Sequence, residues 1–346
     1  MSRMLCPPGS LATGIGALPH IDPDAGCRAV LEAFPEFPYA PTLPNRGPCE
    51  AIVFSDVQFL PGRVREEGRI YSDTRKDLTA EMEKIYLDYV EGNYTRYAPT
   101  ERYASGFHAM MRQDLSGSCK VKCQLTGPVT LGMQVTDLEK KPLWYDGQFA
   151  DVLPKMIALR ARWYEKEMIA RTGIDETLVV LNEPYLASIG SSVVPVDPET
   201  VRTGWQDIAM MIDGGLGVHC CSNTDWGFVM SLRPSVVSLD AYANAPEFLL
   251  YRDDLVSYYE DGGVVAWGIV PADHRVFSTG TVDSLHEKYL GIRKAVTEYV
   301  PEKVFDAQSL ITPNCGIRFA DEAGAAEIMG AAAEISRRVR EIAGNP

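Results

Sequence analysis

A histidine and two adjacent cysteines end an apolar run near the middle of the chain, at His219, Cys220 and Cys221. On an extended strand alternate side chains share a face, so His219 and Cys221 point the same way and Cys220 points to the opposite side. Imidazole and thiolate are both preferred ligands of Zn²⁺. The pair has the ligand types and the spacing for one half of a zinc site. Taken alone, however, a buried histidine with two core cysteines is the simpler interpretation.

Two further segments end in side chains of the same kind. Asp240 closes the strand-like run Val236–Asp240, and Cys315 lies in a loop after another apolar run. In a (β/α)₈ barrel the functional residues lie at the carboxyl ends of the strands, on one common rim. Three nitrogen and sulfur ligands with an optional carboxylate are typical of a catalytic zinc site that keeps one position open. The sequence has no C-x-x-C pair, which argues against a structural zinc ribbon.

Strand-like and helix-like segments alternate along the chain, which predicts a parallel sheet covered by helices. With a count near eight strands, we expect an α/β fold of the (β/α)₈ TIM-barrel type. No internal repeat, charge block or low-complexity linker interrupts it, so we expect one catalytic domain over residues 1–346. The predicted strands are Thr13–Leu18, Ala51–Ser55, Val121–Leu125, Leu178–Leu181, Gly217–Cys221, Val236–Leu239, Val264–Ile269 and Val304–Ile311. The predicted helices are Asp73–Val90, Phe149–Ala170, Pro198–Ile212, Val282–Tyr299 and Ala320–Ile342.

Charge and composition exclude several classes of function. The chain has 346 residues, with 33 Lys and Arg against 47 Asp and Glu, for a net charge of -14. This balance argues against binding to nucleic acid or to an anionic membrane surface, both of which rely on basic side chains. No apolar run reaches the roughly 18 residues of a membrane-spanning helix, and the N-terminus is a poor signal peptide. We therefore expect a cytoplasmic protein whose eight cysteines are not a disulfide framework.

Taken in order, the motifs resemble the C-terminal catalytic barrel of cobalamin-independent methionine synthase. The resemblance extends over nearly the whole chain, and its most specific part is the combination of H-x-C with the later N-C-G. The segments that carry it are Thr13–His20, Leu181–Pro184, His219–Cys221, Val236–Leu250 and Pro313–Gly316.

The resemblance implies roles for individual residues. Ala17 stands where the family usually has Ser, Asn182 where it has Asp, and Asp240 where it has Glu. Asp273 stands at the position of a functional histidine, and His274 follows it. His20 could line the pocket or cap the following helix. The implied metal ligands are His219, Cys221, Asp240 and Cys315, the implied substrate-binding residues are Gly16, Ala17, His20, Asn182 and Glu183, and the implied catalytic residues are Asp240 and His274.

The resemblance also implies a reaction. The long enzyme of the family carries an extra N-terminal barrel tied to folate binding, and this chain resembles the short core form without it. That form implies Zn²⁺ as cofactor, homocysteine as acceptor, and methylcobalamin or a methylated corrinoid protein as methyl donor. A free thiol has a pKa of about 8.5, and coordination to zinc deprotonates it for attack on the methyl carbon. A corrinoid leaves without a proton, whereas the nitrogen of a departing folate requires one.

Two alternatives stay open. The first is methyl transfer from a corrinoid to another thiol such as coenzyme M, which bears a sulfonate in place of an amino group. The second is a metal-free barrel similar to uroporphyrinogen decarboxylase, which needs clustered arginines near the N-terminal motif; Arg46 and Arg63 are not such a cluster in the sequence. Lys122 and Gln124 are interpreted either as substrate contacts or as satisfied interior groups. Glu50 is interpreted as a solvated loop residue in preference to a ligand of the substrate ammonium group.

Overall fold

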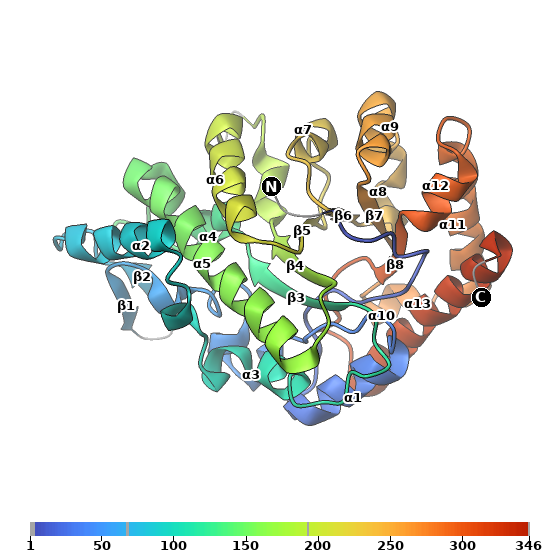
Figure 1. Ribbon diagram of the computed structural model, residues 1–346, viewed down its shortest axis with the longest axis horizontal. Helices are drawn as coiled ribbons and strands as arrows, with labels where there is room; N and C mark the ends of the chain where they lie inside the picture. The colour runs from blue at the N-terminus through green and yellow to red at the C-terminus, as the bar shows by residue number, and fades with distance from the viewer. Residues whose placement is uncertain (1–3, 67–68, 192–193, 345–346) are drawn as a thin grey trace.

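A curved parallel sheet of six strands forms the centre of the molecule, and helices cover its outer side (Figure 1). The computed structural model describes residues 4–66, 69–191 and 194–344. The strands follow one another around the sheet in sequence order, from β3 to β8. The strands are β3 (Val121–Thr126), β4 (Thr177–Asn182), β5 (Gly215–Cys220), β6 (Val236–Leu239), β7 (Val264–Val270) and β8 (Ser309–Pro313).

Helices connect the successive strands, as the alternation of patterns predicted. The five predicted helices are confirmed, with ends that differ by a few residues. Asp197 caps the third of them by accepting a hydrogen bond from Thr200 N, and Pro198 occupies its first turn. The helices are α1 (Pro23–Ala33), α2 (Thr79–Glu91), α3 (Glu101–Met110), α4 (Pro128–Gln134), α5 (Gly147–Thr172), α6 (Pro198–Met211), α7 (Trp226–Ser231), α8 (Ala241–Phe248), α9 (Arg252–Glu260), α10 (His274–Phe277), α11 (Val282–Val296), α12 (Glu302–Ala307) and α13 (Glu322–Ala343).

The two edges of the sheet are extended by single parallel bridges and not by full strands. Ala12 bridges to Ile311 beside β8, and Tyr39 bridges to Lys122 beside β3. A third bridge joins Ala17 to Thr42, so the two flanking segments also touch each other. The architecture is thus consistent with a TIM-like barrel, but the six parallel strands are two fewer than the eight we predicted.

Three predicted strands are wrong or only partly right, for local reasons. Thr13–Leu18 contains Gly16 at φ 40°, a left-handed conformation that breaks an extended ladder. Ala51–Ser55 forms turns, and the preceding stretch is rich in proline, which cannot donate to a ladder. Val304–Ile311 divides between the end of α12 and the start of β8.

A small antiparallel hairpin lies apart from the main sheet, at the left of Figure 1. It consists of β1 (Arg63–Glu66) and β2 (Arg69–Ser72). Side chains alternate across a strand, so Arg63 and Arg65 share one face of β1. Among the described residues, no helix is long and apolar enough to cross a membrane.

The apolar core has two parts, one on each side of the sheet. The larger part lies between the strands and the surrounding helices and includes Cys220, Trp267 and Phe248. The smaller part consists of side chains with the opposite parity on the strands. Its members are Leu5, Leu11, Phe37, Leu178, Val180, Val236, Val264, Ala266 and Leu310. Polar side chains at strand positions of this same parity are therefore the ones that face the inner side of the sheet.

Candidate functional site

His219 occupies the carboxyl end of β5, with its side chain on the inner face. The register pairs it with Ser238 of β6, and its Nδ1 lies 2.9 Å from the Ser238 hydroxyl oxygen. The other ring nitrogen, Nε2, is buried and has no hydrogen-bond partner among the described residues. A buried polar atom without a partner is costly and calls for an explanation. Here the ring is fixed through one nitrogen while the other presents an unused ligand atom.

Two thiols complete a compact group with this imidazole. The ligand atoms of His219, Cys221 and Cys315 all lie within 4.8 Å of one another. Cys221 follows β5 directly, whereas Cys315 comes from the loop after β8, 94 residues along the chain. Their separation in sequence means that the curvature of the sheet brings the two strand ends together. These are three of the four residues that the sequence predicted as metal ligands, without Asp240, and their distances suit three ligands of one ion.

The pKa values of the two thiols are shifted in opposite directions. The Cys221 thiol hydrogen-bonds to the sulfur of Cys315, and this bond lowers the pKa of Cys315, with His219 adding to the effect. The same hydrogen bond raises the pKa of Cys221, as does burial. One thiolate is therefore favoured even in the absence of a metal ion, and a cation at this point would be needed to favour both.

Cys220 lies on the opposite side of β5, as strand parity predicted. It is buried in the core cluster between sheet and helices, and its thiol donates to the carbonyl of Ser222 at 3.3 Å. Burial raises its pKa to about 12, so it stays protonated at neutral pH. Adjacent cysteines in the sequence thus have unrelated environments.

Asp240 lies beside the cluster but outside the group of three. Its carboxylate accepts a hydrogen bond of 2.9 Å from Ala243 N and so caps the start of α8. Burial raises the pKa of Asp240, and the negative charge of Cys315 acts in the same direction. Asp240 is thus bonded to the start of α8, and its charge interacts with those of Cys315 and His219.

The loop that carries Cys315 packs against the first motif of the chain. A Cβ placed on Gly316 would lie 2.8 Å from the Cβ of Ala17, so only glycine allows this approach. Ile317 N donates to the carbonyl of Ala17 at 2.8 Å. Gly16, at φ 40°, turns the chain there and has its carbonyl paired with Thr42 N. The structure thus brings Gly16 and Ala17 next to the loop that holds Cys315.

Asn182 ends β4 on the inner face and is paired in register with His219. Its amide oxygen accepts a hydrogen bond of 2.6 Å from Gln124 Nε2 of β3. Gln124 Oε1 is buried without a partner among the described residues. The side-chain amides of Asn182 and Gln124 thus form a row on β4 and β3, next to His219 on β5.

Glu183 has the opposite parity and does not join this row. Its carboxylate accepts hydrogen bonds from Val129 N at 3.0 Å, Thr130 N at 2.8 Å and Thr130 Oγ1 at 2.6 Å. These donors belong to the first turn of α4, where a negative charge is favourable. Burial raises the pKa of Glu183 to about 7. We therefore assign Glu183 to the support of α4 and not to substrate binding.

The two remaining predicted histidines differ in burial. His20 is 4% exposed, and its Nδ1 is buried without a partner among the described residues. It does not cap α1, since Asp22 does so by accepting from Asp24 N. His274 begins α10 and pairs with Glu327 of α13 at 3.0 Å, partly in solvent. That surface pairing gives His274 a structural role, and the structure does not bring it into the cluster.

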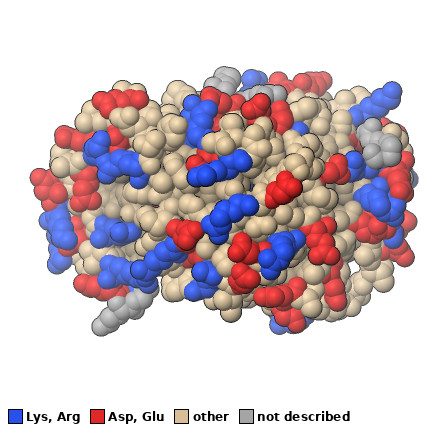
Figure 2. Space-filling model, turned by 60° about the horizontal axis from the view of Figure 1, so that its bottom comes forward, with Lys and Arg blue, Asp and Glu red and all other residues tan. Residues whose placement is uncertain are grey.

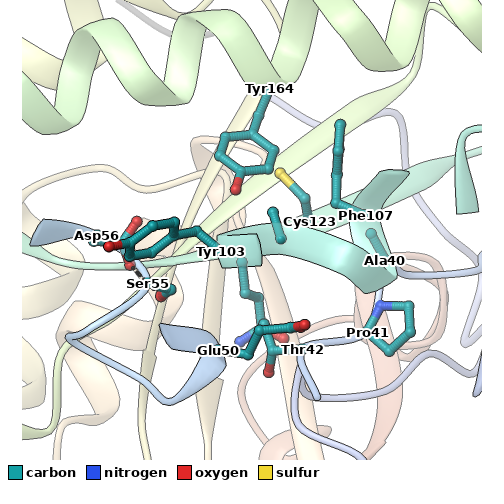
Figure 3. A pocket seen from close by; sticks show the side chains of 12 residues that line it. Ala40, Pro41, Thr42, Glu50, Ser55, Asp56, Tyr103, Phe107, Cys123 and Tyr164 are labelled. Atoms are coloured by element: carbon teal, nitrogen blue, oxygen red, sulfur yellow. Dashed lines mark hydrogen bonds between the residues drawn. The ribbon is translucent and has the colours of Figure 1, made fainter. Parts of the chain in front are cut away.

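A small cavity lies beside β3 and opens a second polar region (Figure 3). Its volume is about 20 Å³, enough for one water molecule. Glu50 is one of its lining residues and is only 4% exposed, so its prediction as a solvated loop residue is wrong. Its carboxylate accepts hydrogen bonds from Arg46 at 2.9 Å and from Ser105 at 2.5 Å. Glu50, Gln124 and Ser238 are polar inner residues whose partners could not be read from the sequence.

Comparisons with known proteins give distant likenesses only. No family model and no curated protein matches the chain. Among solved structures, a B12-independent methionine synthase from Shewanella sp. W3-18-1, in complex with selenomethionine, aligns at a TM-score of 0.44 with 16% identity, over 64% of this chain and 63% of that one. The chain thus spans less than two thirds of that synthase.

Two glycoside hydrolases align to a similar degree. GH5_18 from Streptomyces cattleya, in complex with GlcNAc, has a TM-score of 0.49 and 13% identity over 96% of this chain and 80% of that one. Another glycoside hydrolase has a TM-score of 0.42 and 13% identity over 79% of this chain and 96% of that one. Likenesses of this size to enzymes with different chemistry assign no function, so the function must be argued from the site itself.

Proposed function

We propose that this chain is a zinc-dependent methyltransferase that forms methionine from homocysteine, with methylcobalamin or a methylated corrinoid protein as donor, in the cytoplasm. The observation that carries the proposal is the convergence of His219, Cys221 and Cys315 within 4.8 Å from two distant strand ends. The motif resemblance to the catalytic barrel of methionine synthase adds the reaction. We also infer that the segments around Ala12 and Tyr39, which bridge to the sheet edges, complete a (β/α)₈-type barrel as one domain over residues 1–346.

The donor set fits Zn²⁺ on chemical grounds. Nitrogen and thiolate sulfur are its usual ligands, and three protein ligands are typical of a catalytic site. His219 satisfies two further requirements, because its Nε2 has no hydrogen-bond partner in the described part of the chain and its Nδ1 is oriented by Ser238. Asp240 stands close enough to act on the charge of the site. A bound Zn²⁺ would supply a Lewis acid that keeps an acceptor thiol deprotonated at neutral pH.

The protein residues would contribute orientation and charge. Ser238 holds the plane of the His219 ring, so the imidazole does not have to be ordered during the reaction. The thiolates of Cys221 and Cys315 concentrate negative charge, which keeps an acceptor sulfur nucleophilic. Asn182, which is paired in register with His219, would offer its amide NH₂ as a donor to the polar end of the acceptor.

The environment of Asn182 also supports the second candidate function. An amide NH₂ donates, and a donor at this position suits a carboxylate or a sulfonate better than an ammonium group. Glu183, the adjacent carboxylate, is used by α4 and supplies no negative charge to the rim. An acceptor with an anionic end and no amino group, such as coenzyme M, is therefore the alternative on the same site.

Two measurements test the proposal in sequence. The purified protein should hold one zinc per chain, the Cys221→Ser, Cys315→Ser double variant should lose it, and Cys220→Ala on the same strand should keep it. Stoichiometric zinc in the double variant would refute the site. Incubation with methylcobalamin and a panel of thiols should then give methionine from homocysteine. The colour change at cobalt is the measure of the reaction.

The donor is tested by a matched arm with methyl-tetrahydrofolate. A folate needs a proton for its departing nitrogen, and the predicted histidine at that region, His274, is paired with Glu327 at the surface. We therefore expect no methionine with the folate. A rate with the folate that equals or exceeds the rate with methylcobalamin would overturn the donor assignment. Methylation of coenzyme M but not homocysteine would favour the second candidate.

A further inference from the structure

Three arginines from separate parts of the chain line one pocket beside β1. Arg46, Arg65 and Arg102 line it together with the backbone of residues 47–48, Cys49 and Glu50. Arg46 ends a short 3₁₀ helix (Pro44–Arg46) between α1 and β1, Arg65 belongs to β1 and Arg102 to the first turn of α3. The sequence separates them by up to 56 residues, which is why they did not form a cluster in the sequence pattern.

The charges of these arginines are only partly compensated. Arg46 pairs with the carboxylate of Glu50 at 2.9 Å. Arg65 donates a hydrogen bond to the sulfur of Cys49 at 3.3 Å. Among the described residues, neither Arg65 nor Arg102 makes an ion pair with a carboxylate. With Glu50 ionised, the group of four carries an excess of two positive charges. In a chain of net charge -14, such an excess is not a consequence of composition.

Guanidinium chemistry indicates what this pocket would bind. Charges of both signs are spread over the face shown in Figure 2, so the excess at the pocket is local. Like charges held close together repel, and an anion between them relieves the repulsion. Guanidinium groups present planar pairs of N–H donors that match the oxygens of phosphate and carboxylate groups.

We propose that Arg46, Arg65 and Arg102 form a binding site for a doubly charged oxyanion, of the phosphate monoester class. The excess of two positive charges matches a dianion. The pocket volume of about 200 Å³ is below the roughly 300–1,000 Å³ of sites that enclose a drug-sized ligand, so it accepts the anionic end group of a larger molecule. The site is separate from the cysteine cluster and does not depend on the proposed zinc chemistry.

Isothermal titration with inorganic phosphate tests the site, in a phosphate-free buffer at constant ionic strength. We expect saturable binding of one phosphate per chain. Arg65→Gln and Arg102→Gln should each weaken binding about tenfold, and the double variant should abolish it. Arg63→Gln is the matched control, because Arg63 is an exposed arginine on the same strand that does not line the pocket, and it should bind as the wild type does.

Further arms separate the alternatives. Succinate supplies two carboxylates in place of a phosphate, and tighter binding of succinate would overturn the assignment to the phosphate class. Equal phosphate affinity in wild type and the Arg65→Gln, Arg102→Gln variant would overturn the site itself. The Cys221→Ser, Cys315→Ser variant should bind phosphate normally, so a failure of the zinc proposal would leave this result unchanged.

Discussion

Replacing Ser238 by alanine tests whether the environment of His219 is built for a metal ion. The hydroxyl of Ser238 is 3% exposed and lies 2.9 Å from His219 Nδ1, and Nε2 has no partner of its own. Without the hydroxyl, the imidazole loses the contact that fixes its plane and its tautomer. Partners of this kind typically contribute a factor of about 10–100 in metal affinity, which corresponds to about 1.4–2.8 kcal/mol.

The assay is competition for zinc against a chromophoric chelator, with wild-type, Ser238→Ala and Cys220→Ala proteins measured side by side. We expect Ser238→Ala to bind zinc about 10–100 times more weakly and Cys220→Ala to match the wild type, because Cys220 lies on the far side of the strand. Circular dichroism and thermal unfolding should show that both variants keep the fold. Wild-type zinc affinity in Ser238→Ala would refute the argument that His219 is oriented through Nδ1.

The remaining predictions concern stability and loop geometry. Lys122 is buried, its Nζ donates to the carbonyl of Gly14, and burial lowers its pKa to about 7. The folded protein therefore binds this proton less tightly than the unfolded chain, so the free energy of unfolding of the wild type should rise by up to about 2–3 kcal/mol between pH 7 and pH 9 relative to that of Lys122→Met. Denaturant unfolding measures this difference, and parallel pH profiles of the two proteins would contradict it. Asp56→Ala should destabilise the protein by about 3–5 kcal/mol, because it leaves the fully buried Arg160 without its partner at 3.1 Å, and a loss under 1 kcal/mol would show that the pair is dispensable. Gly316→Ala should weaken zinc binding without unfolding the chain, because the new methyl group meets Ala17 and displaces the loop of Cys315; unchanged zinc affinity would mean that this loop adapts freely.

Strand parity and motif order predicted the convergence of His219, Cys221 and Cys315. The alternation of side chains along β5 placed His219 and Cys221 on one face and Cys220 on the other, because that alternation is a property of any extended chain. The helices of the second half were predicted from apolar spacing and capping residues such as Asp197. These features are local, so the residues that determine them are adjacent in the sequence.

The tertiary structure decided what depends on distant partners. Glu183 is next to Asn182, but its side chain lies on the opposite face of the strand. There both of its carboxylate oxygens accept hydrogen bonds from the first N–H groups of α4. The pairing of His274 with Glu327 depends on where α13 packs. In the first quarter of the chain, the left-handed Gly16 interrupts one predicted strand, and turns replace another at Ala51–Ser55. No local pattern reports such contacts, because their free energy arises between segments that meet only after folding.

The arginine pocket shows the same division between sequence and fold. The sequence by itself determined the residue types that could serve as ligands, their parity on each strand, and an acidic chain ill suited to nucleic acid. It could not determine that Arg65 and Arg102 converge on the pocket beside Arg46, since that depends on where β1 and α3 lie in the folded chain. Charge acts through space and not along the chain, so only the folded structure could show where the positive charge of an acidic protein accumulates.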